Sequence, residues 1–501
     1  MFLAGIPTNL LNALNLMFNT LENAYRRGIR WSLAGSVGAA LFQFLQMAVF
    51  ARLAGPAALG DYALAATCIG FLMPLAEAGL GQALVQARDI TPRQLVSLGW
   101  LNMVLGASMF VLVWWLGPFL GAWYGRPELA GLMVLMGLSL LFSPLGAQGA
   151  GLLHRDMQFD GLAKVETLAW ASSFVFVSLL AWLGWGAWAM GAGFVLRNAL
   201  NTTGFCWLAR AQFPADWRNP APLRAVGPLV RFGLFDLASR WTDVLSNYLD
   251  KMIVGKWLGV SALGYYNLAF TFLMLPTARL GYVITRVGYP VFARIRDDTV
   301  QLQAFFGRMS AELTLVLFPV YAGLALFSRE IVTLIFGADW LPAAPLFVAF
   351  SLAGLVRAVA TPFPQLLQGL GRTGRLFAWN LFWTLGLNGM LVLFLWWNPG
   401  ILQAAWSRAA AAWLFEIPLL WWLAQRCGLR FGPLLQTSGR AILYLWPVVV
   451  FTLLAGWIPG SFGVVFALKI GVFLIGMAWF GWKSPMREVT GDLVRQFGRG
   501  A

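Results

Sequence analysis

The stretch at residues 229–259 reads LVRFGLFDLASRWTDVLSNYLDKMIVGKWLG. It is apolar enough to cross a bilayer as a helix, yet polar side chains recur in steps of four, three, four and three residues, at Asp236, Arg240, Asp243, Asn247 and Asp250. Helical periodicity places them on one face, which drifts by about 20° per heptad and extends for about 21 Å. Charge at that depth is costly against lipid, so this face is predicted to point into a helix bundle or a wet cavity.

Two interpretations of this face remain open. In the first, the face lines a transport cavity. In the second, Arg240 neutralises Asp236 and Asp243, which lie at i,i+4 and i,i+3 spacing from it, and the face has only a structural role. The aromatic residues Trp241 and Tyr248 on the same helix could stack on sugar rings or simply pack against neighbouring helices.

The stretch has a counterpart 204 positions earlier, at residues 29–55, IRWSLAGSVGAALFQFLQMAVFARLAG. This alignment sets Gln43 opposite Asn247 and Gln46 opposite Asp250. It continues into ARLAGPAALGDYALA (51–65) over GKWLGVSALGYYNLA (255–269), where glycine, leucine and tyrosine positions coincide. The sequence therefore predicts two related halves in the same orientation, with an uncharged stripe in the first half and a charged stripe in the second.

Composition predicts an integral membrane protein. The chain has 501 residues, of which 59% are hydrophobic and 11% are charged, whereas soluble domains carry about 25% charged residues. About 14 apolar segments are long enough to span a bilayer as helices. They lie at 31–53, 58–86, 95–121, 129–153, 163–184, 186–209, 229–257, 262–288, 305–327, 341–369, 376–397, 400–424, 439–458 and 461–482.

The distribution of basic residues predicts the orientation. Of the 35 lysines and arginines, 24 fall before the first segment, in the alternate loops on one side, or in the tail. The positive-inside rule then places both termini in the cytoplasm, and the net charge of +15 indicates affinity for anionic lipid rather than for nucleic acid. The predicted divisions are an N-terminal extension that could form an interfacial helix (1–25), a six-helix bundle (26–210), a cytoplasmic linker (211–228), a second six-helix bundle (229–425), and two extra helices with a tail (426–501).

Signatures of enzymes and metal sites are absent from the sequence. His154 is the single histidine, and the three cysteines are scattered in or beside apolar segments. There is no Gly-rich phosphate loop and no H-E-x-x-H pattern. The sequence predicts no catalytic residue, no metal site and no cofactor, and the short outer loops argue against a glycosyltransferase.

Two further pairs of charges call for an interpretation. Glu77 in FLMPLAEAGLG and Arg279 in FLMLPTARLGY occupy equivalent positions of the two halves. They could meet as an inner gate, or each could pair locally or extend toward the headgroups. Glu416 and Lys469 lie in the last helices, where we expect a structural ion pair.

Several short motifs resemble one transporter family. They are ARLAGPAALGDYALA (51–65), PLAEAGLGQALVQ (74–86), GLLHRDMQFDGLAKVE (151–166), DKMIVGKWLGVSALGYYNLA (250–269) and LLQGLGRTGR (366–375). Their order and spacing, over about residues 26–480, resemble the oligosaccharide flippases (polysaccharide transporters, Wzx-like, of the colanic-acid-exporter type) of the multidrug/oligosaccharidyl-lipid/polysaccharide (MOP) exporter superfamily.

The resemblance implies an all-α fold of two six-helix bundles, related by a pseudo-two-fold around a central cavity, with the last two helices outside. It also implies a multi-pass transporter of the cell inner membrane, without enzymatic activity. Such a protein flips undecaprenyl-pyrophosphate-linked oligosaccharides to the periplasmic or outer leaflet by alternating access, for the synthesis of exopolysaccharide, O-antigen or capsule.

A pyrophosphate headgroup would need cations in the cavity, and Asp236, Asp243 and Asn247 could bind sugar hydroxyls or a coupling cation. The candidate cations are Arg30, Arg52, Arg197, Arg240, Arg279 and Arg357. Expected partners are the lipid-linked oligosaccharide, membrane lipids, H⁺ or Na⁺ as coupling ion, a polysaccharide polymerase and a chain-length regulator. Three other functions stay open: a cation-coupled exporter of drugs or metabolites, a membrane glycosyltransferase or polymerase, and a lipid scaffold.

Overall fold

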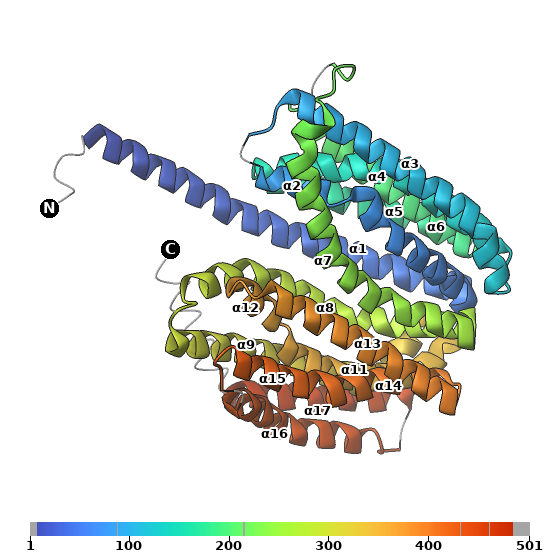
Figure 1. Ribbon diagram of the computed structural model, residues 1–501. Helices are drawn as coiled ribbons and strands as arrows, with labels where there is room; N and C mark the ends of the chain where they lie inside the picture. The colour runs from blue at the N-terminus through green and yellow to red at the C-terminus, as the bar shows by residue number, and fades with distance from the viewer. Residues whose placement is uncertain (1–7, 88, 214–215, 431, 460, 484–501) are drawn as a thin grey trace. The chain divides into compact units, whose positions relative to one another are not determined.

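The structure is a computed structural model that describes residues 8–87, 89–213, 216–430, 432–459 and 461–483 (Figure 1). Within these residues the chain forms helices and connecting turns, and no strand. Contacts divide the chain into two units, one up to Val244 and one from Leu245, so that the division falls inside a helix, α7.

The first unit contains six helices and most of α7. Their bounds are α1 (Thr8–Glu77), α2 (Leu80–Gln86), α3 (Pro92–Trp123), α4 (Glu128–Arg155), α5 (Phe159–Trp182), α6 (Ala187–Leu208) and α7 (Leu223–Leu258). In its core, apolar residues of α2, α3, α4, α5 and α6 pack around Leu84, Leu98 and Leu153, which are fully buried. Small residues allow close helix contact, since a Cβ on Gly81 of α2 would lie 2.7 Å from the Ala147 carbonyl oxygen of α4.

The predicted internal repeat is visible in the backbone of each unit. Gly55 interrupts α1 with φ 77° and ψ 178°, so that α1 consists of two helical arms. Gly259, its counterpart in the sequence, lies between α7 and α8 with φ 83° and ψ 174°. Such positive φ angles favour glycine, because a Cβ would be strained there. The same turn therefore joins the first two predicted spans of both halves.

The linker between α6 and α7 packs on the N-terminal end of α3. Ser97 Oγ donates to the carbonyl oxygen of Ala221 at 2.9 Å, and Trp100 Nε1 donates to that of Trp217 at 3.1 Å. The Trp217 ring lies over Gly99, where a Cβ would be 2.5 Å from its Cζ3 atom. The absence of a side chain at Gly99 thus makes room for the linker.

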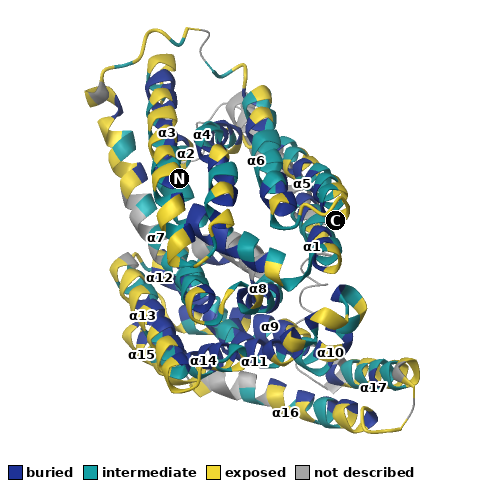
Figure 2. Cartoon of the chain, turned by 90° about the vertical axis from the view of Figure 1, so that its right-hand side faces the viewer, coloured by how far each residue is buried: buried dark blue, intermediate teal, exposed yellow. Residues whose placement is uncertain are grey.

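The second unit contains the remaining helices. They are α8 (Val260–Arg294), α9 (Thr299–Leu326), α10 (Ser328–Ile331), the π-helical turn η1 (Val332–Phe336), the 3₁₀ helix η2 (Ala338–Ala343), α11 (Ala344–Ala360), α12 (Phe363–Gly369), α13 (Thr373–Trp397), α14 (Ile401–Ala411), the π-helical turn η3 (Ala412–Glu416), α15 (Ile417–Arg426), α16 (Gly432–Ala455) and α17 (Phe462–Lys483). Buried residues gather along α9, α11 and α14 (Figure 2).

The N-terminus of α9 is capped by Asp298. Its carboxylate accepts hydrogen bonds from the backbone N–H groups of Gln301 and Val300, both at 3.0 Å. These bonds stabilise the ionised form and hold the pKa of the Asp298 carboxyl below its usual value.

Eight helices of the described chain are long and apolar enough to cross a membrane. One of them, at 35–77, covers most of two predicted spans, because α1 continues through Gly55. The predicted all-α, polytopic membrane fold is confirmed.

Candidate functional site

The charged stripe lies on α7 and is divided between the two units. Asp236, Arg240 and Asp243 belong to the first unit, and their side chains lie outside the described residues. Asn247 and Asp250 belong to the second unit, where Asn247 is half-buried and Asp250 is only 1% exposed. The described end of the stripe therefore lies in the core of the second unit.

Asp250 is the centre of a buried polar network. Its Oδ2 accepts hydrogen bonds from Arg408 Nη1 of α14 at 2.7 Å and from the Tyr266 hydroxyl of α8 at 2.8 Å. Its Oδ1 accepts one from the backbone N–H of Lys251 at 2.8 Å. These three donors replace the hydrogen bonds that a buried carboxylate loses with water. The bonds from Tyr266 and Arg408 also link α7 to α8 and α14.

A second cation lies beside this network. The Lys251 ammonium is 4.7 Å from the centre of the Phe270 ring, and the Arg408 guanidinium carbon is 4.6 Å from the same centre. Cations are attracted to the electron-rich face of an aromatic ring. One carboxylate and two cations, from Asp250, Lys251 and Arg408, thus lie around Tyr266 and Phe270 of α8.

The first unit has an uncharged equivalent of this network. Gln46, the repeat counterpart of Asp250, is buried, and its Nε2 donates to the sulfur of Met190 on α6 at 3.4 Å. In each unit, this position of the repeat contacts the last span of its predicted six-helix bundle. The charges of the Asp250 network are therefore specific to the second half and are not required by the fold.

Glu416 and Lys469 do not form the expected ion pair. Lys469 Nζ of α17 instead contacts Glu330 Oε1 of α10 and donates to the Leu326 carbonyl oxygen at 3.1 Å. The prediction was wrong because helix order along the chain does not specify which carboxylate packs against Lys469.

Glu416 ends the π-helical turn η3 and is 1% exposed. Neither of its carboxyl oxygens has a hydrogen-bond partner in the described part of the chain. η3 packs against α11 and α14, which carry Arg357 and Arg408, and the charges of both guanidinium groups act on Glu416. Glu416 is therefore a buried carboxyl group beside two cations, without a bond to either.

The other predicted site residues are spread over both units. In the first unit, Arg52 is exposed on α1, and the Arg197 guanidinium lies over the Trp170 ring at 4.2 Å. Glu77 at the end of α1 accepts a hydrogen bond from Ser143 Oγ at 3.3 Å. In the second unit Arg357 is half-buried. The side chains of Arg30 and Arg279 lie outside the described residues.

The two aromatic residues of α7 have neighbours within their own units. Trp241 lies edge-on to Phe71 of α1, with ring centres 6.4 Å apart. The Tyr248 ring lies 5.3 Å from the Lys251 ammonium. These contacts fit the packing interpretation of both side chains.

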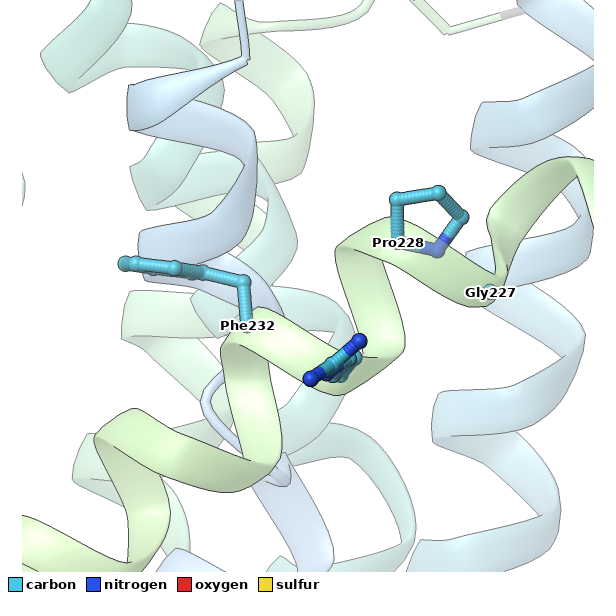
Figure 3. A pocket seen from close by; sticks show the side chains of 4 residues that line it. Gly227, Pro228 and Phe232 are labelled. Carbon is cyan, nitrogen blue, oxygen red and sulfur yellow. The ribbon is translucent and has the colours of Figure 1, made fainter.

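A pocket of about 490 Å³ opens on the first turns of α7 (Figure 3). Gly227, Pro228, Arg231 and Phe232 line it. Its lining combines a guanidinium with apolar surface, and it lies about one turn before Asp236 on the same helix. No group of three or more metal-ligating side chains occurs among the described residues.

Sequence reasoning missed the roles of Arg408 and Tyr266. Arg408 is an isolated charge in an apolar span. Its sequence context indicates that it needs a buried acid as partner, but not that the acid is Asp250. Tyr266 coincides with Tyr62 in the repeat, which marked the position but not its bond to Asp250. The missing information is the packing of helices 158 residues apart.

Comparison with known proteins agrees with this architecture. The chain is 28% identical to the teichuronic acid biosynthesis protein TuaB of Bacillus subtilis (strain 168), over 73% of this chain and 74% of that protein. It is 28% identical to the lipopolysaccharide biosynthesis protein WzxC of Escherichia coli (strain K12), over 71% and 72%. The predicted resemblance to Wzx-like proteins is confirmed.

The fold is similar to that of the lipid II flippase MurJ in an inward closed conformation, with a TM-score of 0.72 and 16% sequence identity. The match covers 90% of this chain and 99% of that one. The profile of the family described as "Polysaccharide biosynthesis protein" matches residues 49–345, more than half of the sequence. This integral membrane chain therefore belongs to the polysaccharide biosynthesis protein family.

Proposed function

We propose that the protein is a flippase that moves a lipid-linked oligosaccharide across the membrane and has no enzymatic activity. The observation that carries this proposal is the family match over residues 49–345, on a chain whose fold is similar to that of a lipid II flippase. TuaB and WzxC, by their names, serve the synthesis of teichuronic acid and lipopolysaccharide. In our proposal, this chain moves the sugar-bearing lipid of such a pathway to the outer leaflet.

The chemistry of such a substrate fits α7. A pyrophosphate and its sugars cannot enter hydrocarbon without partners, because unpaired polar groups and charges are costly there. In our proposal, Arg240 binds the phosphate through its planar guanidinium, while Asp236 and Asp243 orient it. The pocket beside Arg231, on the same helix, supports the view that α7 faces accessible space.

The remaining parts of the proposal rest on the distribution of basic residues and on what the resemblance to the flippase family implies. Undecaprenyl pyrophosphate is the lipid carrier, the protein lies in the inner membrane, and both termini are cytoplasmic. Alternating access moves the headgroup outward, with Glu77 and Arg279 approaching one another when the inner side closes. H⁺ or Na⁺ supplies the driving force, and a polymerase with a chain-length regulator uses the product.

Variants of Arg240 test the role of the stripe. Arg240→Ala should abolish flipping in liposomes while the melting temperature stays near that of the wild type, and Arg240→Lys should keep part of the activity because it keeps the charge without the planar fork. Arg218→Ala, which removes an exposed linker arginine, is the matched control. Normal flipping by well-folded Arg240→Ala would exclude this role, and a loss of folded protein before any loss of flipping would indicate the structural interpretation.

A further inference from the structure

The second unit contains two fully buried acids with opposite surroundings. Asp250 receives three hydrogen bonds, one of them from a guanidinium. Glu416 is equally buried, at 1% exposure, yet both of its carboxyl oxygens lack a partner in the described part of the chain. The fold thus satisfies one ionised carboxylate completely and leaves the other without a donor.

The elements packed against Glu416 offer cations and no other acid. η3 packs against α11, α13, α14 and α15. In these four helices the charged residues are Arg357, Arg375, Arg408 and Arg426, and there is no aspartate or glutamate. Arg375 and Arg426 lie at the helix ends and are joined through the Arg426 carbonyl oxygen, at 3.1 Å. Arg408 is bound to Asp250.

Arg357 is thus the available cation for Glu416. Its charge acts on Glu416, but its guanidinium forms no hydrogen bond or ion pair in the residues that the structure describes. It is half-buried, so it combines nearness to Glu416 with partial access. Because α11 packs against η3, a movement of one element along the other can bring the unbonded carboxyl and guanidinium together.

The position of Glu416 favours such a movement. It ends a π-helical turn, Ala412–Glu416, and π-turns inside helices occur frequently at functional sites. An ionised carboxylate without partners is strongly disfavoured in a dry core, so the conformation described here holds Glu416 as the neutral acid.

We propose that Glu416 is a proton-binding site whose protonation decides whether Arg357 is available to an anionic substrate group. When Glu416 is protonated, Arg357 is free to bind a phosphate. When the proton leaves to water, the carboxylate captures the guanidinium and the phosphate loses its partner. This inference rests on the proposed flippase function and deepens it, because it names H⁺ as the coupling ion and a residue that carries it.

Infrared difference spectroscopy of the full-length protein in liposomes tests the proton site directly. At near-neutral pH, where exposed carboxyl groups are already ionised, the wild type should show a protonated carboxyl band that disappears on alkalinisation. Glu416→Gln should lack this band. Glu312→Gln, which removes a partly exposed carboxylate paired with Arg308, is the matched control and should keep it.

Two further variants keep the test decisive. Arg357→Gln should move the disappearance of the band upward by about one pH unit or more, because the ionised carboxylate loses its cation. A merely structural Glu416 would not show this shift. Should Glu416→Gln fail to fold, Glu416→Asp replaces it and should keep a band at an altered frequency. A wild type without the band, or a band that persists in folded Glu416→Gln, would overturn the proposal.

Binding of inorganic pyrophosphate tests the link to the substrate. The charge of pyrophosphate itself changes between about pH 6 and about pH 8, and Glu416→Gln measures the effect of that change alone. Relative to this variant, the wild type should bind pyrophosphate several-fold more tightly at about pH 6 than at about pH 8. An unchanged pH dependence in folded Glu416→Gln would overturn the link to Arg357. Flipping without the infrared band would refute this inference alone, whereas the band without flipping would refute the flippase function and leave the proton site standing.

Discussion

The Asp250–Arg408 pair should be one of the strongest single determinants of stability in the second unit. Its side chains are 1% and 4% exposed, and Nη1 lies 2.7 Å from Oδ2. Arg408→Met would remove this donor and leave Asp250 with the Tyr266 hydroxyl and the Lys251 backbone N–H. Removing one partner of a buried pair costs about 3–5 kcal/mol of unfolding free energy, because the other charge remains buried.

Removing the pair completely should be far less harmful. The double variant Asp250→Leu with Arg408→Met removes both charges of the pair and leaves the half-buried Lys251 ammonium over the Phe270 ring, but it strands the Tyr266 hydroxyl, at about 1–3 kcal/mol. Adding Tyr266→Phe removes that cost as well, so the triple variant should come within about 1 kcal/mol of the wild type or exceed it. The costs of the single variants should therefore be strongly non-additive.

Equilibrium unfolding in mixed micelles, followed by tryptophan fluorescence, measures these differences. Arg308→Met is the matched control, since it breaks an exposed arginine–carboxylate pair with Glu312 at 3.0 Å and should cost no more than about 1 kcal/mol. If Arg408→Met costs no more than this control, or if the double variant is as unstable as the sum of the singles, the network does not contribute as argued.

Three further predictions test other parts of the account. Glu77→Arg combined with Arg279→Glu should restore part of the flipping lost in either single variant, and a double variant no better than the worse single would exclude a gate. Gly99→Leu should displace Trp217 and speed limited proteolysis of residues 211–222, whereas Gly307→Ala, where a Cβ meets nothing within 4 Å, should not; equal rates would show that the linker does not depend on this contact. Because the folded-state pKa of Asp298 is lowered, its contribution to stability is complete above the unfolded-state pKa and is lost as the pH falls through the folded-state value. Protection of the first turn of α9 against hydrogen exchange, relative to the intrinsic exchange rate at each pH, should therefore fall on acidification. In Asp298→Ala this protection should be low at every pH, and equal protection in the two proteins would contradict the role of the cap.

Much of the fold was predictable because it depends on local patterns. Apolar segments of about 20 residues predict helices that span a bilayer. The repeat aligned Gly55 with Gly259, and both adopt nearly the same extended, positive-φ conformation. A positive φ angle of this kind is favourable only for glycine, so the repeated glycine in the sequence predicts where the turn occurs.

The site was less predictable because it depends on which helices pack together. Spacing placed Asp250 on the same face as Asp236, but the partner of Asp250 is Arg408, on a helix far along the chain. The same limitation explains why Lys469 was assigned to Glu416 and instead contacts Glu330. A charge pattern along one helix shows that a partner is needed, but not which residue supplies it.

The central claim is tested most directly by headgroup movement. Purified protein in liposomes receives a fluorescent undecaprenyl-pyrophosphate-linked oligosaccharide, and a membrane-impermeant quencher reports the fraction of headgroups in the outer leaflet over time. The account predicts exchange between leaflets well above that of protein-free liposomes, no formation of new sugar linkages, and strong reduction by Arg240→Ala. Headgroups that stay in their leaflet in the presence of well-folded protein, with or without a proton or sodium gradient, would contradict it.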